Sequence, residues 1–504
     1  MAIFHNNDVS SLSKRIDLWL HLAGKKAAKH IKRAPRQKQS IKSLRLPDIP
    51  AEIWGIVIYH ACLLYYDPLD TSNELSFLDE SPLRLSTYRD SMKLKTTIAL
   101  VSKQWNAFVR IPLYEFVWIS RAGQAKALAR TLLMEYVQGN RSSGEYIRRL
   151  HIETPILARC SPVDLRTILD HAPHLFIYSD HHSVQRSCFF DESDPRYSPE
   201  EILKLVAHPK MRRLSWTSYG DVPFHLRMSP LLKNLATQLE YLELSSCFPH
   251  IRTVFAGSSG QVGNFNTQMD VHLPSLRALK VSLDNNTFSV LASWIMPHLT
   301  NLSVLSSDFS YTGPGFASFF EAHGAKIRQL ELGHCSTIVE EHYLTAPSAH
   351  LQNQPPKSLA EWCPNLREFI CSAEAEWHWQ APDWIAPHIL LPSHPTLELI
   401  GIRDLDARLC NDPGEAYFPL YTQMCDLLQA DLFPSLRFIR DLSEHSHELR
   451  IVKPSPKVMQ FWMRLLERCQ ERGIWYEDYM GVNITMHSLL RANLPNNNAN
   501  RWHF

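Results

Sequence analysis

The sequence predicts an α/β chain in which a small N-terminal group of helices is followed by an irregular solenoid of parallel strands that alternate with helices. Two observations carry this prediction. Apolar triplets with the spacing L-x-x-L-x-L recur through most of the chain, and Ser-Pro pairs typical of helix starts stand before several of them. A chain of 504 residues is also far too long for one small core, so an extended array fits its length.

Changes in composition divide the chain into four expected segments. These are a basic N-terminal segment at 1–43, a helical module at 44–119 with an inserted loop at about 67–90, the solenoid at 120–480, and a C-terminal tail at 481–504. The basic segment fits a solvated tail, a nuclear-import signal or a grip on phosphate. The Asn-rich tail has too little apolar surface to order itself.

The module begins with a helix predicted after Asp48, because a Pro that closely follows an Asp suits the first helical turn. The 3.6-residue period gives this helix two apolar faces. One face carries Ile49, Ile53, Ile56, Val57 and Leu64, and the other carries Trp54, Ile58, Ala61 and Tyr65. One face is enough to fill the core of the module, so we expect a partner protein to cover the other.

A second helix is predicted by an apolar series at helical spacing that ends before Pro112. Its members are Leu94, Ile98, Val101, Trp105 and Phe108. Leu100 lies beside this stripe, so we expect it to make a second contact.

Three short segments follow one another in the module, at 46–54, 99–106 and 112–117. In this order they resemble the F-box of fungal proteins. The resemblance implies a three-helix fold that binds the Skp-type linker of a cullin-based SCF ubiquitin ligase. It implies that the linker-binding surface is formed or supported by Leu46, Pro47, Ile49, Ile53, Trp54, Leu100, Val101 and Trp105. The inserted loop departs from the compact motif, and we expect it at the surface near the partner face.

Helix starts in the solenoid are predicted at four Ser-Pro pairs, where Ser caps the helix and Pro takes its first position. They are Ser161-Pro162, Ser198-Pro199, Ser229-Pro230 and Ser455-Pro456. The helix after Ser455 should end at Gly473, and a last strand should follow at 474–476.

Strands are predicted at the apolar triplets, whose middle and last members point to the core. The triplets are Ile147/Leu150/Ile152, Met211/Leu214/Trp216, Leu239/Leu242/Leu244, Leu276/Leu279/Val281, Leu299/Leu302/Val304, Ile327/Leu330/Leu332, Leu366/Phe369/Cys371 and Leu397/Ile400/Ile402, with a weaker one starting at Phe433. Cys247 and Cys335 follow their triplets where a turning backbone needs a polar partner. This region resembles leucine-rich repeats of uneven length.

A stack of such repeats leaves one sheet face open for binding. Candidate target-binding residues between the buried positions are Glu243, Lys280, Ser303, Glu331 and Arg367. Their mixed charge suits a protein or peptide better than phosphate. A longer insertion adds Trp377, Trp379 and Trp384, which fit either a binding hot spot or local packing against the sheet.

Motifs for catalysis are absent from the sequence, which contains no phosphate-binding loop, dinucleotide fingerprint, zinc-protease motif or nucleophile elbow. Its His pairs lack a second ligand pair, so we expect no metal, no other cofactor and no enzymatic activity. With 52 Lys plus Arg against 51 Asp plus Glu, the chain has no overall attraction to nucleic acid or membrane. Ten cysteines without a CxxC pair, and no signal pattern, predict a cytoplasmic or nuclear protein.

These features favour a non-catalytic substrate adaptor. Its module would bind the Skp-type linker, and through it a cullin, while its solenoid would bind an unidentified target protein, so that a partner enzyme supplies the chemistry. Three alternatives stay open from the residues. The first is a leucine-rich-repeat scaffold that acts outside any ubiquitin ligase, and the second is a nucleic-acid-associated protein that uses the basic segment. The third is an unrecognised hydrolase.

Overall fold

The structure is a computed structural model. It describes residues 50–63, 67–79, 84–139, 142–155, 158–181, 183–184, 199–207, 209–218, 237–246, 271–282, 290–305, 314–332, 357–373, 391–406, 409, 417–443, 446–450 and 455–492. The chain divides into two compact units, residues 1–54 and residues 55–504. The described part of the first unit is the start of one helix.

Three helices build the N-terminal module: α2 (Ala51–Leu63), α3 (Leu85–Ala99) and α4 (Lys103–Glu115). Their shared core is small and consists of Ile58, Cys62, Ile98 and Val109, with Leu94, Ala99, Trp105 and Phe108 packed around it. Ile58 and Cys62 therefore mark the inner side of α2. The other predicted face of this helix is exposed at Ile53, Ile56 and Val57.

The single helix predicted from Leu94 to Phe108 is wrong, because the chain breaks between α3 and α4. Ser102 has an extended backbone and its side chain accepts a hydrogen bond from the backbone N–H of Trp105, so it caps a new helix. The helix also continues through Pro112 to Glu115. Proline removes one backbone hydrogen bond, and burial of Pro112 offsets that loss.

The described residues form a parallel sheet of twelve strands, in which every strand pairs with its neighbours in the sequence. The strands are β1 (Phe116–Ile119), β2 (Arg149–Ile152), β3 (Ile177–Asp180), β4 (Arg213–Ser218), β5 (Tyr241–Ser246), β6 (Ala278–Ser282), β7 (Asn301–Val304), β8 (Gln329–Leu332), β9 (Glu368–Ser372), β10 (Leu399–Arg403), β11 (Phe438–Asp441) and β12 (Trp475–Glu477). Such an order, with one short strand per repeat, is that of a leucine-rich-repeat solenoid, as predicted.

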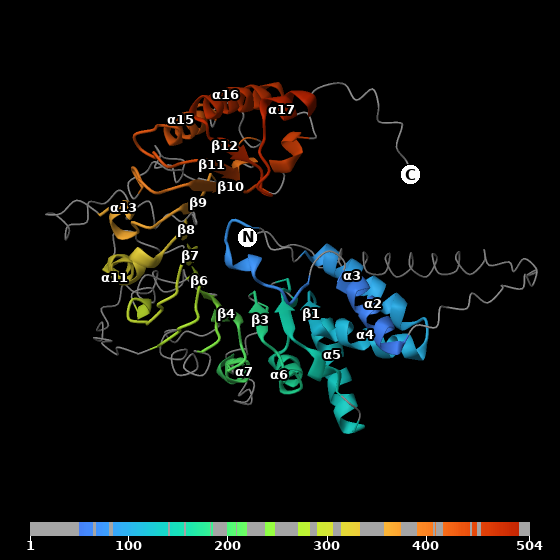
Figure 1. Cartoon of the computed structure of the whole chain (residues 1–504). Coiled ribbons are helices and arrows are strands. Elements are labelled where there is room, and N and C mark those ends of the chain that lie inside the picture. Colours follow the sequence, from blue (N-terminus) through green and yellow to red (C-terminus); the bar gives the residue numbers. More distant parts are fainter. Residues whose placement is uncertain are drawn as a thin grey trace, which may run out of the picture. The chain divides into compact units, whose positions relative to one another are not determined.

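Helices alternate with these strands and pack on one face of the sheet (Figure 1). They are α5 (Ala122–Val137), α6 (Pro162–Asp170), α7 (Pro199–Val206), α11 (Pro314–His323), α13 (Leu359–Trp362), α15 (Tyr417–Leu427), α16 (Pro456–Arg472) and α17 (Met486–Ala492). Their apolar residues and the inward-facing strand residues form one continuous buried cluster. Each fully buried Leu in it contributes about 1.5–3 kcal/mol. Each described helix is too short or too polar to cross a lipid bilayer.

The predicted triplets are confirmed, because their members lie in the core and are almost fully buried. The predicted helix starts are confirmed at Ser161-Pro162 and Ser455-Pro456, with Pro at the first helical position of each. The Ser455 side chain caps its helix by accepting from the N–H of Val458, whereas the Ser161 side chain makes no capping hydrogen bond. Gly473 ends α16 in the left-handed conformation. Ser198, Ser229-Pro230, Cys247 and Cys335 lie outside the described residues.

Two strands, β1 and β3, and the helices α5, α11, α13, α15 and α17 had no individual prediction. β3 was missed because Asp180 replaces the apolar residue at the end of its triplet, and β1 because it directly follows α4. The helix α17 lies inside the expected tail at 481–504, and its Leu489 is buried in the main core.

A glycine at a close approach between repeats gives a test of this packing. Gly324 begins the short helix η5 (Gly324–Lys326), and a Cβ there would lie 2.3 Å from the backbone O of Trp362. We expect Gly324→Ala to lower stability by about 1–3 kcal/mol, because a neighbouring backbone cannot move aside cheaply. Gly123→Ala in α5, where the added Cβ has open space, is the control and should raise stability by up to about 1 kcal/mol.

Thermal unfolding followed by circular dichroism measures both variants. A Gly324→Ala protein that melts together with the wild type would contradict the close approach of Gly324 to Trp362.

Candidate functional site

The sheet face opposite the helices, which we call the front face, carries two rows of side chains in register. The first row is Phe116, Arg149, Ile177, Arg213, Tyr241, Ala278, Asn301, Gln329, Glu368, Leu399, Phe438 and Trp475. The second row is Trp118, His151, Ser179, Ser215, Glu243, Lys280, Ser303, Glu331, Ile370, Gly401, Arg440 and Glu477. Both rows are rich in polar and charged side chains, which is unusual for buried sheet positions.

Residues 67–79, which we call the strap, lie against the first row. The strap includes the short helix η1 (Asn73–Leu75) and belongs to the loop inserted between α2 and α3. The prediction of a surface loop at 67–90 is therefore wrong on two counts. Phe77 and Leu78 of the strap are buried, and residues 85–90 form the start of α3. Side chains of the sheet hold the strap in place, and a local sequence pattern does not report such distant partners.

Glu74 is the charged centre of the strap. Its carboxylate lies 3.2 Å from the guanidinium of Arg149 on β2 and 2.7 Å from that of Arg213 on β4. All three side chains are less than a tenth exposed. Arg213 also stacks on the ring of Tyr241, with its guanidinium carbon 4.3 Å from the ring centre. Removal of any one of these three buried groups would leave an uncompensated buried charge, which would destabilise the protein.

Further hydrogen bonds connect the strap backbone to later repeats. The Asn301 side-chain amide donates to the Leu75 carbonyl at 2.9 Å, and the Phe77 N–H donates to Gln329 Oε1 at 2.7 Å. Arg403, at the end of β10, donates to the Phe77 carbonyl at 2.8 Å. Each contact comes from a different strand, so the strap runs along the first row across the sheet.

Apolar contacts complete the attachment. Phe77 and Leu78 form a second hydrophobic cluster with Tyr241, Ala278, Ile370 and Leu399 of the front face. Gly401 leaves the space that Leu78 needs, because a Cβ there would lie 2.9 Å from Leu78 Cδ2. The front face is therefore partly a hydrophobic interface and not only a polar surface.

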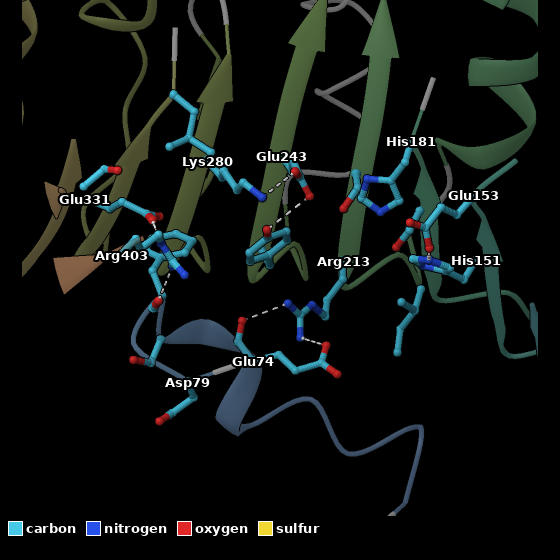
Figure 2. A pocket seen from close by; sticks show the side chains of 18 of the residues that line it. Glu74, Asp79, His151, Glu153, His181, Arg213, Glu243, Lys280, Glu331 and Arg403 are labelled. Atoms are coloured by element: carbon cyan, nitrogen blue, oxygen red, sulfur yellow. Dashed lines mark hydrogen bonds and ion pairs between the residues drawn. The ribbon is translucent and has the colours of Figure 1, made fainter. Parts of the chain in front are cut away.

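A cavity of about 590 Å³ lies between the strap and the second row. Figure 2 shows Glu74 and Asp79 on the strap side, and His151, His181, Glu243, Lys280 and Arg403 on the sheet side. Its charged groups are largely paired: Lys280 with Glu243 at 2.9 Å, and Arg403 with Glu331 at 2.6 Å.

Burial and neighbouring charges change the ionisation of two cavity residues. Burial by itself would raise the pKa of Glu243, but Lys280, His181 and hydrogen bonds from Lys280 and Ser215 lower that pKa to about 2. Burial lowers the pKa of His181 to about 4, assisted by His151 and Lys280 and opposed by Glu243 and Glu153. At neutral pH the cavity therefore presents an ionised carboxylate beside a neutral imidazole.

The predicted target-binding residues divide into three groups. Glu243, Lys280, Ser303 and Glu331 stand side by side in the second row, as the repeat pattern predicted. Ser303 and Glu331 are nevertheless buried, so the expectation of exposed positions is wrong for these two, which bond to each other at 2.6 Å. Arg367 lies one residue before β9, outside both rows, and pairs with Glu398 at 3.1 Å.

Trp377, Trp379 and Trp384 lie outside the described residues, as do Leu46, Pro47 and Ile49 of the module. Among the described module residues, Ile53, Leu100 and Val101 are exposed, while Trp54 is half-buried. Trp105 packs against the core of the module, so it supports the fold.

Sequence reasoning missed the residues that hold the strap, namely Glu74, Arg149, Arg213, Gln329 and Arg403. One signal was present in the strand triplets, because Arg149 and Arg213 occupy the same position before the middle residue of their triplets. A second was the apolar content of Leu75, Phe77 and Leu78 in a segment taken for a polar loop.

Groups of three or more His, Cys, Asp or Glu side chains that would hold a metal ion are not found among the described residues. The two rows offer paired charges, hydrogen-bonding amides and apolar side chains. This chemistry suits the binding of a peptide or protein segment.

Comparisons with known proteins give similarity in structure only. No family model matches the sequence, and no curated protein matches it. Among solved structures, the chain is similar to the leucine-rich repeat-containing protein LegL7 from Legionella pneumophila, with 11% identity, a TM-score of 0.36, and coverage of 75% of this chain and 97% of that one. It is also similar to a chain of the Rad7 and Elc1 complex in yeast, with 11% identity, a TM-score of 0.21, and coverage of 72% and 94%.

The buried His181 predicts a pH dependence of stability. Its folded pKa of about 4 lies below the ordinary value of about 6.5, so the unfolded chain binds more protons between these values. The contribution of His181 is fully present above pH 6.5 and is lost as the pH falls towards 4. We expect His181→Gln to reduce the slope of stability against pH by about 1 kcal/mol per pH unit near pH 5.

Urea unfolding at pH 5, 6 and 7 measures this slope. Ser179→Ala, which lines the same cavity and carries no titrating group, is the control and should keep the wild-type slope. A wild-type slope in His181→Gln would contradict a buried, neutral imidazole.

Proposed function

We propose that this chain is the substrate-recognition adaptor of an SCF-type ubiquitin ligase of the cytoplasm or nucleus. In this proposal the module at 44–119 is an F-box that binds a Skp-type linker and, through it, a cullin. The solenoid at 120–480 binds a target protein. The adaptor itself performs no chemistry, and it raises the concentration of the target near a partner enzyme.

Exposed apolar side chains on the module are the observation that carries this proposal. Leu100 is 87% exposed and Val101 58%, at the junction of α3 and α4, and Ile56 on α2 is 54% exposed. Single exposed apolar residues are common on soluble proteins. Several of them on a domain of three short helices are typical of a protein-binding surface. A partner that covers them gains the free energy of burying this apolar area.

The architecture of the module gives a second support. Three helices around a core of four buried residues agree with the fold that the F-box resemblance implies. The exposed apolar residues of the module do not contribute to this small core. Their exposure is therefore consistent with a role in binding a partner. The solenoid adds a front face that already accommodates a short segment of protein, which is the kind of ligand an adaptor needs.

Capture of a purified Skp-type linker tests the docking half of the proposal. We expect wild-type protein to retain the linker, and the double variant Leu100→Glu with Val101→Glu to bind at least about tenfold more weakly, because two charges replace apolar contacts. Val163→Glu is the matched control: Val163 is 43% exposed on α6, far along the chain from the module.

Each failure has its own meaning. Without capture by the wild type, the ligase proposal falls and an interaction scaffold is left. Undiminished capture by a folded double variant would show that the linker binds another surface of the chain.

A further inference from the structure

The strap, which contains a turn, the 3-10 helix η1 and bends, shows how the front face binds a short irregular segment of protein. Side chains that point out of the sheet make the contacts with the strap. Asn301, Gln329 and Arg403 form hydrogen bonds with its backbone carbonyl and N–H groups. Backbone groups are common to all peptides, so these three residues are suited to hold any segment that adopts the backbone conformation of the strap.

Two kinds of contact, at a fixed spacing along the strap, make the front face selective for particular side chains. Arg149 and Arg213 meet a carboxylate, and they are 4% and 8% exposed at their side chains. Without Glu74 they would be two buried cations that lack a counter-charge, so this position demands an anion. Three residues further along the strap, Phe77 enters the apolar cluster of Tyr241, Ala278, Ile370 and Leu399, and Leu78 follows it.

A third charged contact lies at the far end of the strap. Asp79 is 3.8 Å from the guanidinium of Arg440, which is also held by Glu477 at 2.8 Å. The strap therefore offers the pattern Glu-x-x-Phe-Leu-Asp to both rows of the front face.

The front face also has room beside the strap. The cavity between strap and second row is lined by both, with charged residues such as Glu243 and Lys280 and apolar residues such as Trp118. Among the described residues, the buried atoms His151 Nδ1 and Arg149 Nε in its wall have no hydrogen-bond partner.

We propose that the part of the front face under the strap is a recognition site for an acidic segment of a target protein that has the pattern Glu-x-x-Phe-Leu-Asp and adopts the backbone conformation of the strap, and that the strap is a built-in occupant which the target displaces. This inference deepens the proposed function, on which it rests for the identity of the ligand as a target. The strap then has two roles: it protects the buried arginines in the free protein and sets the affinity that a target must exceed.

Competition between strap and target follows from effective concentration. A segment attached at both ends to its own domain is present at an effective concentration on the order of millimolar. A free peptide with the same contacts therefore competes poorly with an intact strap. Weakening the strap should expose the site, and the same peptide should then bind.

The experiment uses a fluorescent peptide with the sequence of residues 67–79 and the full-length chain. Anisotropy titrations compare the wild type with the variant Glu74→Ala plus Phe77→Ser, in which the strap has lost its charged and its aromatic contact. We expect the variant to bind the peptide at least about tenfold more tightly than the wild type. A matched peptide with Gln at the position of Glu74 should bind the variant at least about tenfold more weakly.

Two further variants make the result decisive. Adding Arg213→Met to the released variant should reduce the preference for Glu over Gln in the peptide, with Arg149 left as the one cation at this position. If the double strap variant does not fold, as judged by its thermal transition, Leu78→Ala alone is used, because it removes one apolar contact and leaves Glu74 in place. It should still bind the peptide more tightly than the wild type.

Equal affinity of the peptide for wild type and released variant would overturn the proposal, because binding would then occur elsewhere. No binding to a folded released variant at about 1 mM peptide would also overturn it and make the strap a purely structural element. The titration contains no linker, and linker capture contains no peptide, so the two proposals fail separately.

Discussion

The front face of the solenoid depends on one arrangement of charge, the carboxylate of Glu74 between Arg149 and Arg213. Two guanidinium groups on β2 and β4 are buried, and burial of an unpaired cation costs several kcal/mol. The carboxylate that pairs directly with both arginines comes from a segment 75 residues before Arg149. This need for a carboxylate explains why an insertion in the helical module packs against strands that lie far from it in the sequence.

With the strap in place, both faces of the sheet are occupied. Helices cover one face and form the main core, while Phe77 and Leu78 form a second apolar cluster on the other. Polar second-row residues beside the strap, such as Glu243 and Lys280, are left around a cavity. Because the strap lies between α2 and α3 in the sequence, the proposed target site and the proposed linker site are joined by one short segment. Displacement of that segment is a physical route by which a bound target would affect the module.

The repeat fold was predictable because burial imposes a regular pattern. Leu279 and Leu330 are apolar for the same reason in each repeat, and Ser455 and Gly473 end a helix by local chemistry. The register of the predicted strand triplets also puts Glu243 next to Lys280, and the two residues are paired in the structure. The strap was not predictable, because Gln329 and Phe77 are 252 residues apart and neither carries a local signal of the other. The break at Ser102 was missed since helical periodicity persists across it. The choice between the two faces of α2 needed the packing of Ile58 and Cys62.

A double-mutant cycle between Glu74 and Arg213 tests the central claim most directly. Glu74→Gln, Arg213→Gln and the double variant are compared with the wild type by chemical unfolding, and an identical cycle on the exposed pair Arg367 and Glu398 is the reference. We predict a coupling energy of about 2 kcal/mol or more for the buried pair and less than about 1 kcal/mol for the exposed pair. Effects at Glu74 and Arg213 that add within about 0.5 kcal/mol would contradict the claim that this contact holds the strap on the sheet.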